Sequence, residues 1–542
     1  MDSATSPSVG ILNTTCLALG THESNHELTT YRPILQVLAI LLLGFMTAAY
    51  VGRRGKPSLP PGPRPLPLVG NLRDMPPKGA LLHEHWLKHK ELYGPVTSVT
   101  VLGQTVIVLH DRAAANYILE TNSIKTANRA CFSHASVAVG ATKLFVMGND
   151  DERQRKYRKL LQHEIGSATA MVKYHALLED EADRLLVAML QDPSRVFESI
   201  RTMANANIMG IAYGYQIERN KADPLLELFE SVPTIVEESV SPFASPVDYL
   251  PWLQHLPNWF PGTGYRQKFK ARAHSLLQSI DQPFLFTRQQ MNQGINQPSV
   301  LSNLIARSGR PNGSNDFDLT PDQQDSIKWM FGSLHGAGSD TTSSAVASFI
   351  IAMMLFPDVQ RKAQQEIDRV VGPHRLPNLE DRANLPYIQA VIKELGRWYT
   401  IVPMGFFHTV TEDLLYDGYL IPKGAHVLPA AWGMNHDASV YKDPDEFKPE
   451  RFSQGEPEPR SSVFGYGRRV CPGQKMGEAS LFCAVSKILA VFNISKSLGH
   501  DGQPLDVKPE MELGFISRPK PVPCVIEPRS EKHELLVRGL RT

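Results

Sequence analysis

A glycine-rich stretch around one cysteine is the strongest chemical signal in this sequence. Residues 464–473 read FGYGRRVCPG, so glycines stand before and after Cys471. Glycines allow the backbone a tight loop, and a helix that starts after the cysteine would place positive dipole at the sulfur. Both features favour thiolate over thiol, and a thiolate held in this way is a good axial ligand for haem iron. A buried structural cysteine beside a glycine turn is the alternative.

The second signal lies inside a long apolar segment, where residues 337–342 read AGSDTT. Glycines weaken a helix locally, and Thr341 can bond back to a carbonyl one turn earlier. A carboxylate beside a hydroxyl at such a turn, here Asp340 beside Thr341, could pass protons from solvent to a bound oxygen. Taken alone, the pattern fits equally well a helix kink with a surface aspartate.

The third signal is a pair of opposite charges three residues apart. Glu394 and Arg397 would share one face of a helix, so their side chains could pair. Most such pairs are solvated surface pairs, and this one is weak by itself. Arg451, farther along the chain, offers a further cation.

The elements that must position these residues are mostly helical. Residues 96–109 predict a hairpin around Leu102 and Gly103, and the pattern from about 110 to 400 is mainly helical. Capping signals at Thr320 and a proline stop at Pro357 bound a long helix. We also expect a helix from Pro386 to before Pro403, short strands over 405–430, a helix just after Cys471 and a loose charged tail after about 526. The fold class is therefore mainly α with small β-sheets.

An uncharged apolar run near the N-terminus, residues 34–51, is long enough to span a bilayer. A signal peptide or a buried core helix is less consistent, because basic residues follow the run instead of preceding it. Asn13 would then be a lumenal glycosylation sequon. We expect five segments: lumenal residues 1–30, a transmembrane anchor at 31–51, a proline-rich hinge at 52–67, a catalytic domain at 68–525 and a charged tail at 526–542.

The composition excludes several classes of protein. Lys and Arg number 56 against 55 for Asp and Glu, so no nucleic-acid partner is indicated. Five scattered cysteines without a CxxC pair argue against a disulfide framework and against a structural zinc site.

Taken together, the three motifs closely resemble the cytochrome P450 superfamily. Residues 464–473 match its F-x-x-G-x-R-x-C-x-G pattern, residues 337–342 its helix motif, and Glu394 with Arg397 its E-x-x-R. Arg451 stands where the family places a third partner of that pair. The anchor and proline hinge match the microsomal form, and the resemblance covers nearly the whole chain.

The resemblance implies a role for each of these residues. Cys471 would be the proximal ligand of a haem b iron, while Asp340 and Thr341 would deliver protons to iron-bound dioxygen. Glu394, Arg397 and Arg451 would be structural. The remaining cofactor-binding residues would be two propionate partners and three members of the cysteine loop: Arg469, His408, Phe464, Gly465 and Gly473.

One departure from the family concerns a Trp-Arg pair that usually contacts a propionate. Asp151 and Glu152 replace it here, so Arg153 or Arg155 is the candidate substitute. The basic run at residues 153–159 would be a docking patch for an acidic reductase, or else a plain solvated helix face. No flavin or nicotinamide domain is indicated, so electrons from NADPH are expected to come from a separate NADPH–cytochrome P450 reductase.

Substrate-facing segments implied by the family carry mostly aromatic residues: Phe132, Phe331, His335, Phe406 and Phe515. Such a pocket suits a small lipophilic or polycyclic substrate. The sequence as a whole is similar to those of fungal family members that act in secondary metabolism. These expectations place the protein in the endoplasmic reticulum membrane as a single-pass protein with a cytosolic catalytic domain.

Two other readings stay open on the sequence. A haem-thiolate enzyme could perform isomerisation, dehydration or peroxide-driven oxidation without a reductase, although Asp340 and Thr341 speak against it. A non-catalytic membrane haem protein is the other, and the full set of active-site residues argues against that.

Overall fold

The computed structural model describes residues 57–540 except 78, 130–136, 220–221, 231, 241–246, 248–250, 258, 261–262, 308–318 and 513, and also residues 36, 37 and 44. The chain divides into two compact units, Met1–Ser58 and Leu59–Thr542. Asn13 and Phe132 lie outside the described residues. Of the predicted anchor, residues 31–51, only residues 36, 37 and 44 are described. Among the described residues no single helix is long and apolar enough to cross a membrane. One pair, Pro321–Leu355 with Pro357–Val370, meets the length and composition test but is bent by 106°.

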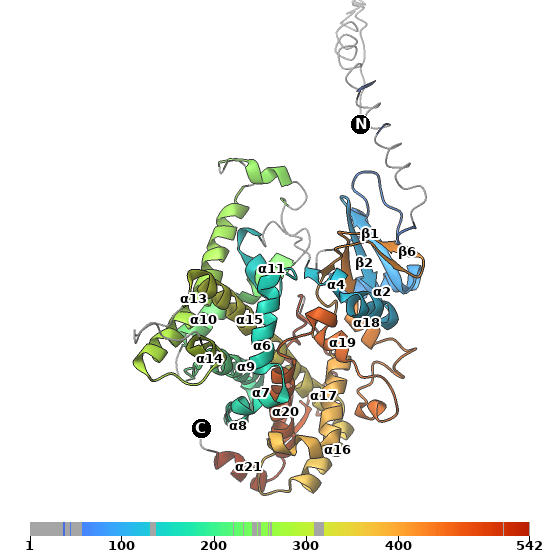
Figure 1. Cartoon of the computed structure of the whole chain (residues 1–542). Coiled ribbons are helices and arrows are strands. Elements are labelled where there is room, and N and C mark those ends of the chain that lie inside the picture. Colours follow the sequence, from blue (N-terminus) through green and yellow to red (C-terminus); the bar gives the residue numbers. More distant parts are fainter. Residues whose placement is uncertain are drawn as a thin grey trace, which may run out of the picture. The chain divides into compact units, whose positions relative to one another are not determined.

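Helices make up most of the described structure (Figure 1), which confirms the predicted fold class. The α-helices of the first half are α2 (Leu82–Tyr93), α3 (Arg112–Ala115), α4 (Ser123–Thr126), α6 (Glu152–Ile165), α7 (Ala168–Met171), α8 (His175–Gln191), α9 (Val196–Tyr213), α10 (Pro224–Glu230), α11 (Val232–Val240) and α13 (Tyr265–Gln293). Those of the second half are α14 (Val300–Arg307), α15 (Pro321–Leu355), α16 (Pro357–Val370), α17 (Pro386–Trp398), α18 (Ala431–Asn435), α19 (Arg460–Phe464), α20 (Gln474–Val491) and α21 (Glu531–Arg538).

The strands form three small sheets. They are β1 (Val96–Val101), β2 (Gln104–Leu109), β3 (Asn128–Arg129), β4 (His408–Thr409), β5 (Leu414–Tyr416), β6 (Tyr419–Ile421), β7 (His426–Pro429), β8 (Phe492–Lys496) and β9 (Cys524–Pro528). The largest sheet has the order β1-β2-β7-β4-β3, and β5-β6 and β8-β9 are separate pairs. The predicted hairpin is β1 and β2, joined at Leu102 and Gly103, which both have positive φ as a tight hairpin turn requires.

Helix α15 is the element on which the site depends, and its ends follow the sequence signals. Thr320 and Gln323 form the predicted capping box, and Pro321 is the first helical residue. The helix ends at Leu355, because a residue before a proline is disfavoured in helical conformation and Pro357 begins α16. It packs against α9, α13 and α20. Nearly every side chain from residue 344 to 354 is buried, as expected for a core helix.

The folded unit extends beyond both predicted ends of the catalytic domain, residues 68–525. The Pro61 carbonyl accepts a hydrogen bond from Ser98 N at 2.9 Å, and a side chain at Gly62 would overlap the Ser98 carbonyl oxygen. The folded unit therefore begins at Leu59 and includes the end of the predicted hinge.

The prediction of a loose tail after residue 526 is wrong. Strand β9 pairs with β8, and α21 packs against α8 with Val537 fully buried. The charged residues of the tail obscured this in the sequence, because they flank a few apolar positions that fix the segment to the core.

Two buried histidines predict a loss of stability in acid. Burial lowers the pKa of His110 from 6.5 to about 3, helped by Lys90 and His89, and burial lowers that of His426 to about 4. The unfolded chain therefore binds protons that the folded chain excludes. The free energy of unfolding should be level above about pH 6.5 and fall below it by up to about 1.4 kcal/mol per pH unit for each histidine.

Urea unfolding followed by circular dichroism between pH 7.5 and pH 4.5 measures this slope. His110→Gln should flatten it, whereas His274→Gln, at an exposed histidine, should not. An unchanged slope in the His110 variant would contradict the assignment.

Candidate active site

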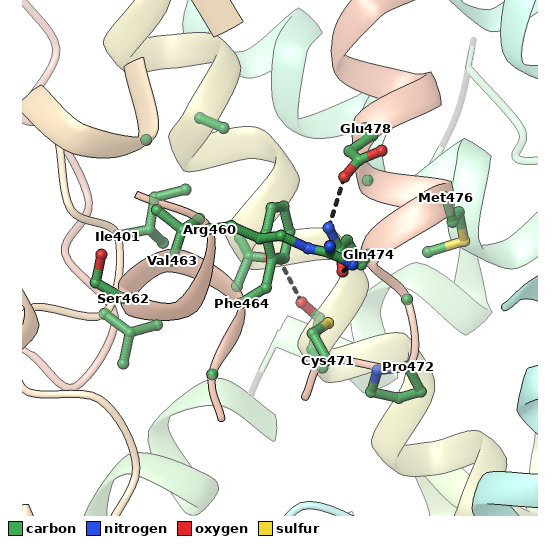
Figure 2. Close-up of a pocket in the computed structure, with 18 of the residues that line it drawn as sticks. Ile401, Arg460, Ser462, Val463, Phe464, Cys471, Pro472, Gln474, Met476 and Glu478 are labelled. Atoms are coloured by element: carbon green, nitrogen blue, oxygen red, sulfur yellow. Dashed lines mark hydrogen bonds between the residues drawn. The ribbon is translucent and has the colours of Figure 1, made fainter. Parts of the chain in front are cut away.

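The cysteine loop connects α19 to α20 and is held by its own backbone. Cys471 N donates to the Phe464 carbonyl at 2.7 Å, which closes the loop (Figure 2). Gly465 has a φ of 86° and Gly467 one of 49°, in the region that favours glycine. A Cβ at Gly467 would lie 2.7 Å from the Leu119 carbonyl oxygen, so the loop is packed tightly against its neighbours. Helix α20 begins at Gln474, close to the predicted start.

The sulfur of Cys471 faces a cavity of about 510 Å³. Burial raises the pKa of the Cys471 thiol, although the Gly473 N–H and the Arg158 cation act in the opposite direction. Burial therefore opposes the thiolate, whereas the backbone N–H of the glycine loop favours it, as the sequence predicts. A metal ion bound to the sulfur would remove the proton outright, so the site suits a metal ligand better than a free nucleophile.

The cavity is bounded by segments that are far apart in sequence. Phe464, Gly465 and Gly473 of the cysteine loop line one side, and the α15 residues Ala337, Gly338 and Thr341 line another. The apolar part of the lining includes Leu334, Ile401, Val402, Phe406 and Ile516. The predicted cofactor loop and one of the two predicted proton carriers are therefore brought to one space.

Five arginines among the described residues line this cavity, and three of them, Arg129, Arg158 and Arg469, act on one another electrostatically. Burial and the charges of the other two hold the pKa of Arg129 well below its usual range. Burial lowers the pKa of Arg469 to about 10, again with a contribution from Arg158. No carboxylate among the described residues forms an ion pair with any of the three, so the charges of Asp150 and Asp151 compensate the cluster only from a distance. Such a cluster fits a ligand with two carboxylates, as haem has in its propionates.

Sequence reasoning missed Arg129 and misplaced Arg158. Arg129 lies in β3 and belongs to no motif. Arg158 belongs to the basic run that was interpreted as a surface patch, yet it donates to the Val470 carbonyl at 2.8 Å. Neither Arg153 nor Arg155, the predicted substitutes for the missing Trp-Arg pair, lines the cavity; Arg155 is exposed.

His408 lines the same cavity and lies near the arginines. Its Nδ1 donates to the Thr126 carbonyl at 2.8 Å, and burial and the Arg129 cation hold its pKa well below the usual range. Because Nδ1 carries the proton of the neutral ring, Nε2 could donate to a carboxylate only as imidazolium. An anion beside it would raise its pKa and favour that form.

Asp340 and Thr341 are neighbours in sequence but lie on different sides of α15. The Thr341 hydroxyl donates to the Ala337 carbonyl at 2.7 Å and faces the cavity. Asp340 is buried and pairs with Arg518 at 2.9 Å. Sequence reasoning missed Arg518, which is 178 residues away and carries no motif.

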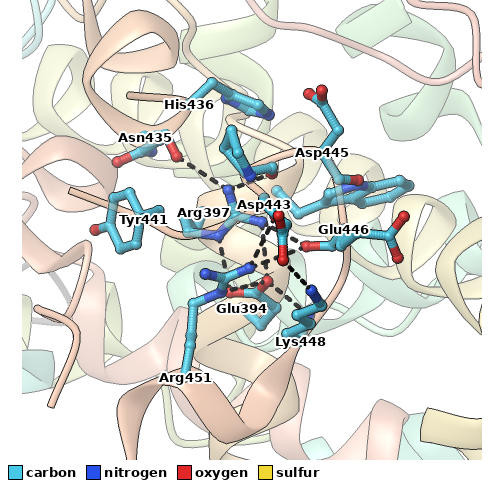
Figure 3. A network of polar contacts seen from close by, with 12 residues as sticks. Glu394, Arg397, Asn435, His436, Tyr441, Asp443, Asp445, Glu446, Lys448 and Arg451 are labelled. Carbon is cyan, nitrogen blue, oxygen red and sulfur yellow. Dashed lines mark hydrogen bonds and ion pairs between the residues drawn. The ribbon is translucent and has the colours of Figure 1, made fainter. Parts of the chain in front are cut away.

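Glu394 is the centre of a buried ionic network (Figure 3). Its carboxylate accepts hydrogen bonds from Arg397 at 2.8 and 2.9 Å and from Arg451 at 3.0 Å. Lys448 N donates to it as well, at 2.8 Å. The side chains of Glu394 and Arg397 have no exposed area.

The network reaches the cysteine loop through two further residues. Arg397 donates to the Asn435 carbonyl at 3.0 Å, and the Ser462 hydroxyl donates to Asn435 Oδ1 at 2.6 Å. Ser462 lies in α19, two residues before Phe464, whose carbonyl binds Cys471 N. The ion pair therefore positions the loop and does not face the chemistry.

The predicted substrate-facing residues divide into two groups. Phe406 lines the cavity, and the Phe515 ring packs on it with centroids 4.5 Å apart. Phe331 and His335 are placed elsewhere, which corrects the prediction. They lie one turn apart on the face of α15 that meets Tyr213 of α9 and Phe229 of α10.

Comparison with known proteins gives a consistent result. The family model described as Cytochrome P450 matches residues 60–524. The cytochrome P450 monooxygenase CLM2 of Gibberella zeae is 38% identical over 94% of this chain and 96% of its own length. The multifunctional cytochrome P450 monooxygenase af510 of Aspergillus fumigatus is 37% identical over 95% and 96%. The O-methylsterigmatocystin oxidoreductase of Aspergillus flavus is 36% identical over 94% and 96%.

Removal of the central carboxylate should unfold the site. Glu394→Gln keeps the side-chain shape but leaves two buried arginines without their shared anion. The free energy of unfolding should fall by about 3–5 kcal/mol. Glu456→Gln is the matched control, because Glu456 also pairs with Arg451, at 2.6 Å, but is partly exposed, and its loss should cost about 1 kcal/mol. Equal losses in urea unfolding of the two variants would contradict the central role of Glu394.

Proposed function

Since this chain belongs to the cytochrome P450 family and is a haem monooxygenase, we propose that it holds haem b through the Cys471 sulfur and oxidises a lipophilic small molecule. One oxygen atom of O₂ enters the substrate, and the other leaves as water with two electrons from NADPH and two protons. The observation that carries the proposal is the place of Cys471. It faces a cavity whose lining also holds the cluster of Arg129, Arg158 and Arg469, which have no carboxylate partner among the described residues.

The arginines would hold the two propionates. Arg469 already donates to the Ala127 and Gly148 carbonyls, which uses two of its five N–H groups and fixes the plane of the guanidinium. Arg129 is fixed similarly by the Val146 and Phe407 carbonyls. Both therefore present their remaining donors with little loss of side-chain entropy. With thiolate ligation, haem supplies oxygen activation, because the thiolate pushes electron density that favours O–O cleavage.

The proton carriers act from α15. Thr341 Oγ1 holds a proton at the cavity and donates it to the Ala337 carbonyl in the absence of another acceptor. Asp340, held by Arg518, would replace the proton that Thr341 passes on. The two side chains leave the helix in different directions, so Asp340 would act on Thr341 through bound water and not by direct contact.

The substrate proposal is supported by the lining of the cavity. Leu334, Val402, Phe406 and Ile516 are apolar, and Ser333 supplies one hydroxyl. Apolar walls with few polar groups suit a lipophilic or polycyclic compound. One relative is named for O-methylsterigmatocystin and comes from a fungus, which supports a fungal secondary metabolite as the substrate class.

A separate NADPH–cytochrome P450 reductase would supply the electrons at the face of α6. Arg155, Lys156 and Lys159 are exposed there. Arg158 of the same helix binds the Val470 carbonyl, one residue before Cys471, so the basic face borders the cysteine loop. An acidic partner docked here would approach the sulfur closely.

The location rests on the sequence. Residues 34–51 would anchor the protein in the endoplasmic reticulum membrane, and the basic residues that follow would keep the catalytic unit in the cytosol. Protection of that unit from protease in sealed microsomes would contradict this orientation.

Cys471→Ser tests the central bond. The purified variant should lose the reduced carbon-monoxide spectrum of a haem thiolate, because a serine hydroxyl does not replace the thiolate as a strong ligand. Cys524→Ser, at a second free cysteine, should leave that spectrum unchanged. An unaltered spectrum in the Cys471 variant would end the proposal.

Charge reversal tests the reductase face. The double variant Arg155→Glu with Lys159→Glu should raise the KM for reductase on the order of tenfold, with the larger effect at low salt. Lys268→Glu with Lys270→Glu on α13 is the control of equal charge change and should leave the KM near that of the unaltered protein. Equal KM values for both doubles would locate the docking surface elsewhere.

A further inference from the structure

Residues 514–518, here called the wall turn, form part of the boundary of the cavity that Cys471 faces. Ile516 lines that cavity directly. The Phe515 ring packs on Phe406, another lining residue, with ring centroids 4.5 Å apart and ring planes tilted by 60°. The position of the wall turn therefore sets how much room the cavity offers on this side.

The far end of the wall turn is fixed to two other elements. Ser517 N donates to the Ile401 carbonyl at 2.8 Å, and Ile401 itself lines the cavity. Arg518 pairs with Asp340 of α15 at 2.9 Å. Both contacts act on the last two residues of the turn, so they do not by themselves fix the two residues that face the ligand space.

Glu237 of α11 holds the near end of the wall turn. Its Oε1 accepts a hydrogen bond from Phe515 N at 3.0 Å, across 278 residues of sequence. A carboxylate is a stronger acceptor for a backbone N–H than a neutral oxygen is. Helix α11 packs in turn on α13 and α15, so the turn is tied to the helical core.

Gly514 makes room for this carboxylate. A Cβ at position 514 would lie 2.5 Å from Glu237 Oε1 and 3.1 Å from the Ile516 carbonyl oxygen. The φ of Gly514 is not positive, so the backbone conformation alone does not require a glycine here. The close approach of the Glu237 side chain does, because a glycine lets another group reach the backbone.

Glu237 also acts on the far end of the wall turn. Burial lowers the pKa of Arg518, but the charges of Asp340 and Glu237 outweigh burial and hold that pKa above its usual range. One carboxylate of α11 thus interacts with the turn at both ends, by a hydrogen bond to Phe515 N and by charge to Arg518.

We propose that Glu237 is a positioning residue that sets the size selectivity of the cavity, because it holds Phe515 and Ile516 at the cavity wall. The inference rests on the proposed function, since it assumes that a lipophilic ligand lies in this cavity beside haem. Without the hydrogen bond, the Phe515 N–H loses its partner and the wall turn yields to a bulky ligand. A ligand too small to reach the wall binds as before.

Hydrogen exchange measures the contact itself. In Glu237→Ala the amide of Phe515 should exchange about tenfold faster, because its acceptor is gone. In Glu237→Gln it should stay protected, because the amide oxygen still accepts. Glu227→Ala, at an exposed glutamate of the neighbouring helix α10, is the matched control and should leave the exchange unchanged. Equal exchange at Phe515 in Glu237→Ala and in the unaltered protein would overturn the inference.

Azole titration of the holoenzyme measures the size selectivity. An azole nitrogen binds haem iron, and the change in haem absorbance reports the Kd. Clotrimazole carries a bulky triphenylmethyl group, whereas imidazole occupies only the space at the iron. In Glu237→Ala the Kd for clotrimazole should fall several-fold while that for imidazole stays the same, and Glu237→Gln should keep both values. An unchanged or raised Kd for clotrimazole in Glu237→Ala overturns the role of Glu237.

Gly514→Ala reaches the same contact from the other side. The added methyl group displaces the Glu237 carboxylate, which is the end of a flexible side chain, and leaves α11 unaltered. The clotrimazole Kd should fall here as well, and this variant decides the question if Glu237→Ala does not fold. An unaltered protein whose haem absorbance responds to neither azole would overturn the proposed function. A normal response with the same Kd ratio in Gly514→Ala overturns only the role of Glu237.

Discussion

The carboxylate of Glu394 is shared by two buried arginines, and the position of the cysteine loop depends on that sharing. Taking three charges out of water is costly, and only close, multiple hydrogen bonds offset the cost. Arg397 and Arg451 provide them at 2.8 to 3.0 Å and also bind the carbonyls of residues 442–446. The network thereby fixes an irregular segment to α17. Asn435 and Ser462 extend this rigidity to α19, and the Phe464 carbonyl extends it to Cys471 N.

The cavity that Cys471 faces presents the opposite electrostatic situation. Arg129, Arg158 and Arg469 are close enough to depress the pKa of Arg129 and have no carboxylate partner among the described residues. The Cys471 thiol lines the same cavity. Holding each of these groups at this site destabilises the folded chain, and binding of an iron porphyrin with two carboxylates would offset that cost. Cofactor binding and stability of the folded state are therefore coupled, because a ligand that binds only the folded chain stabilises it by mass action.

Helix α15 divides the space above the cysteine into two environments with different chemistry. Its apolar side faces a cavity suited to a lipophilic ligand. Exclusion of water from such a cavity limits side reactions. Its other side faces a separate space of about 180 Å³, whose lining includes the polar residues His335, Ser339 and Asn205. Consecutive residues of a helix point about 100° apart, so Asp340 and Thr341 face different environments although they are neighbours in sequence.

Local pattern alone determined much of this protein. The hairpin at 96–109, the capped start of α15, the proline at its end and the turn at Gly465 depend on neighbouring residues, so they were readable from the sequence. Motif spacing likewise singled out Cys471, Asp340, Thr341 and Glu394. The tertiary structure decided what lies next to them: Arg129 and Arg158 in the cationic cluster, Arg518 beside Asp340, and His335 against Phe229 instead of in the cavity that Cys471 faces. It also placed the charged tail on the core. These contacts join segments tens to hundreds of residues apart, and they depend on which face of each helix packs inward, which no local pattern specifies.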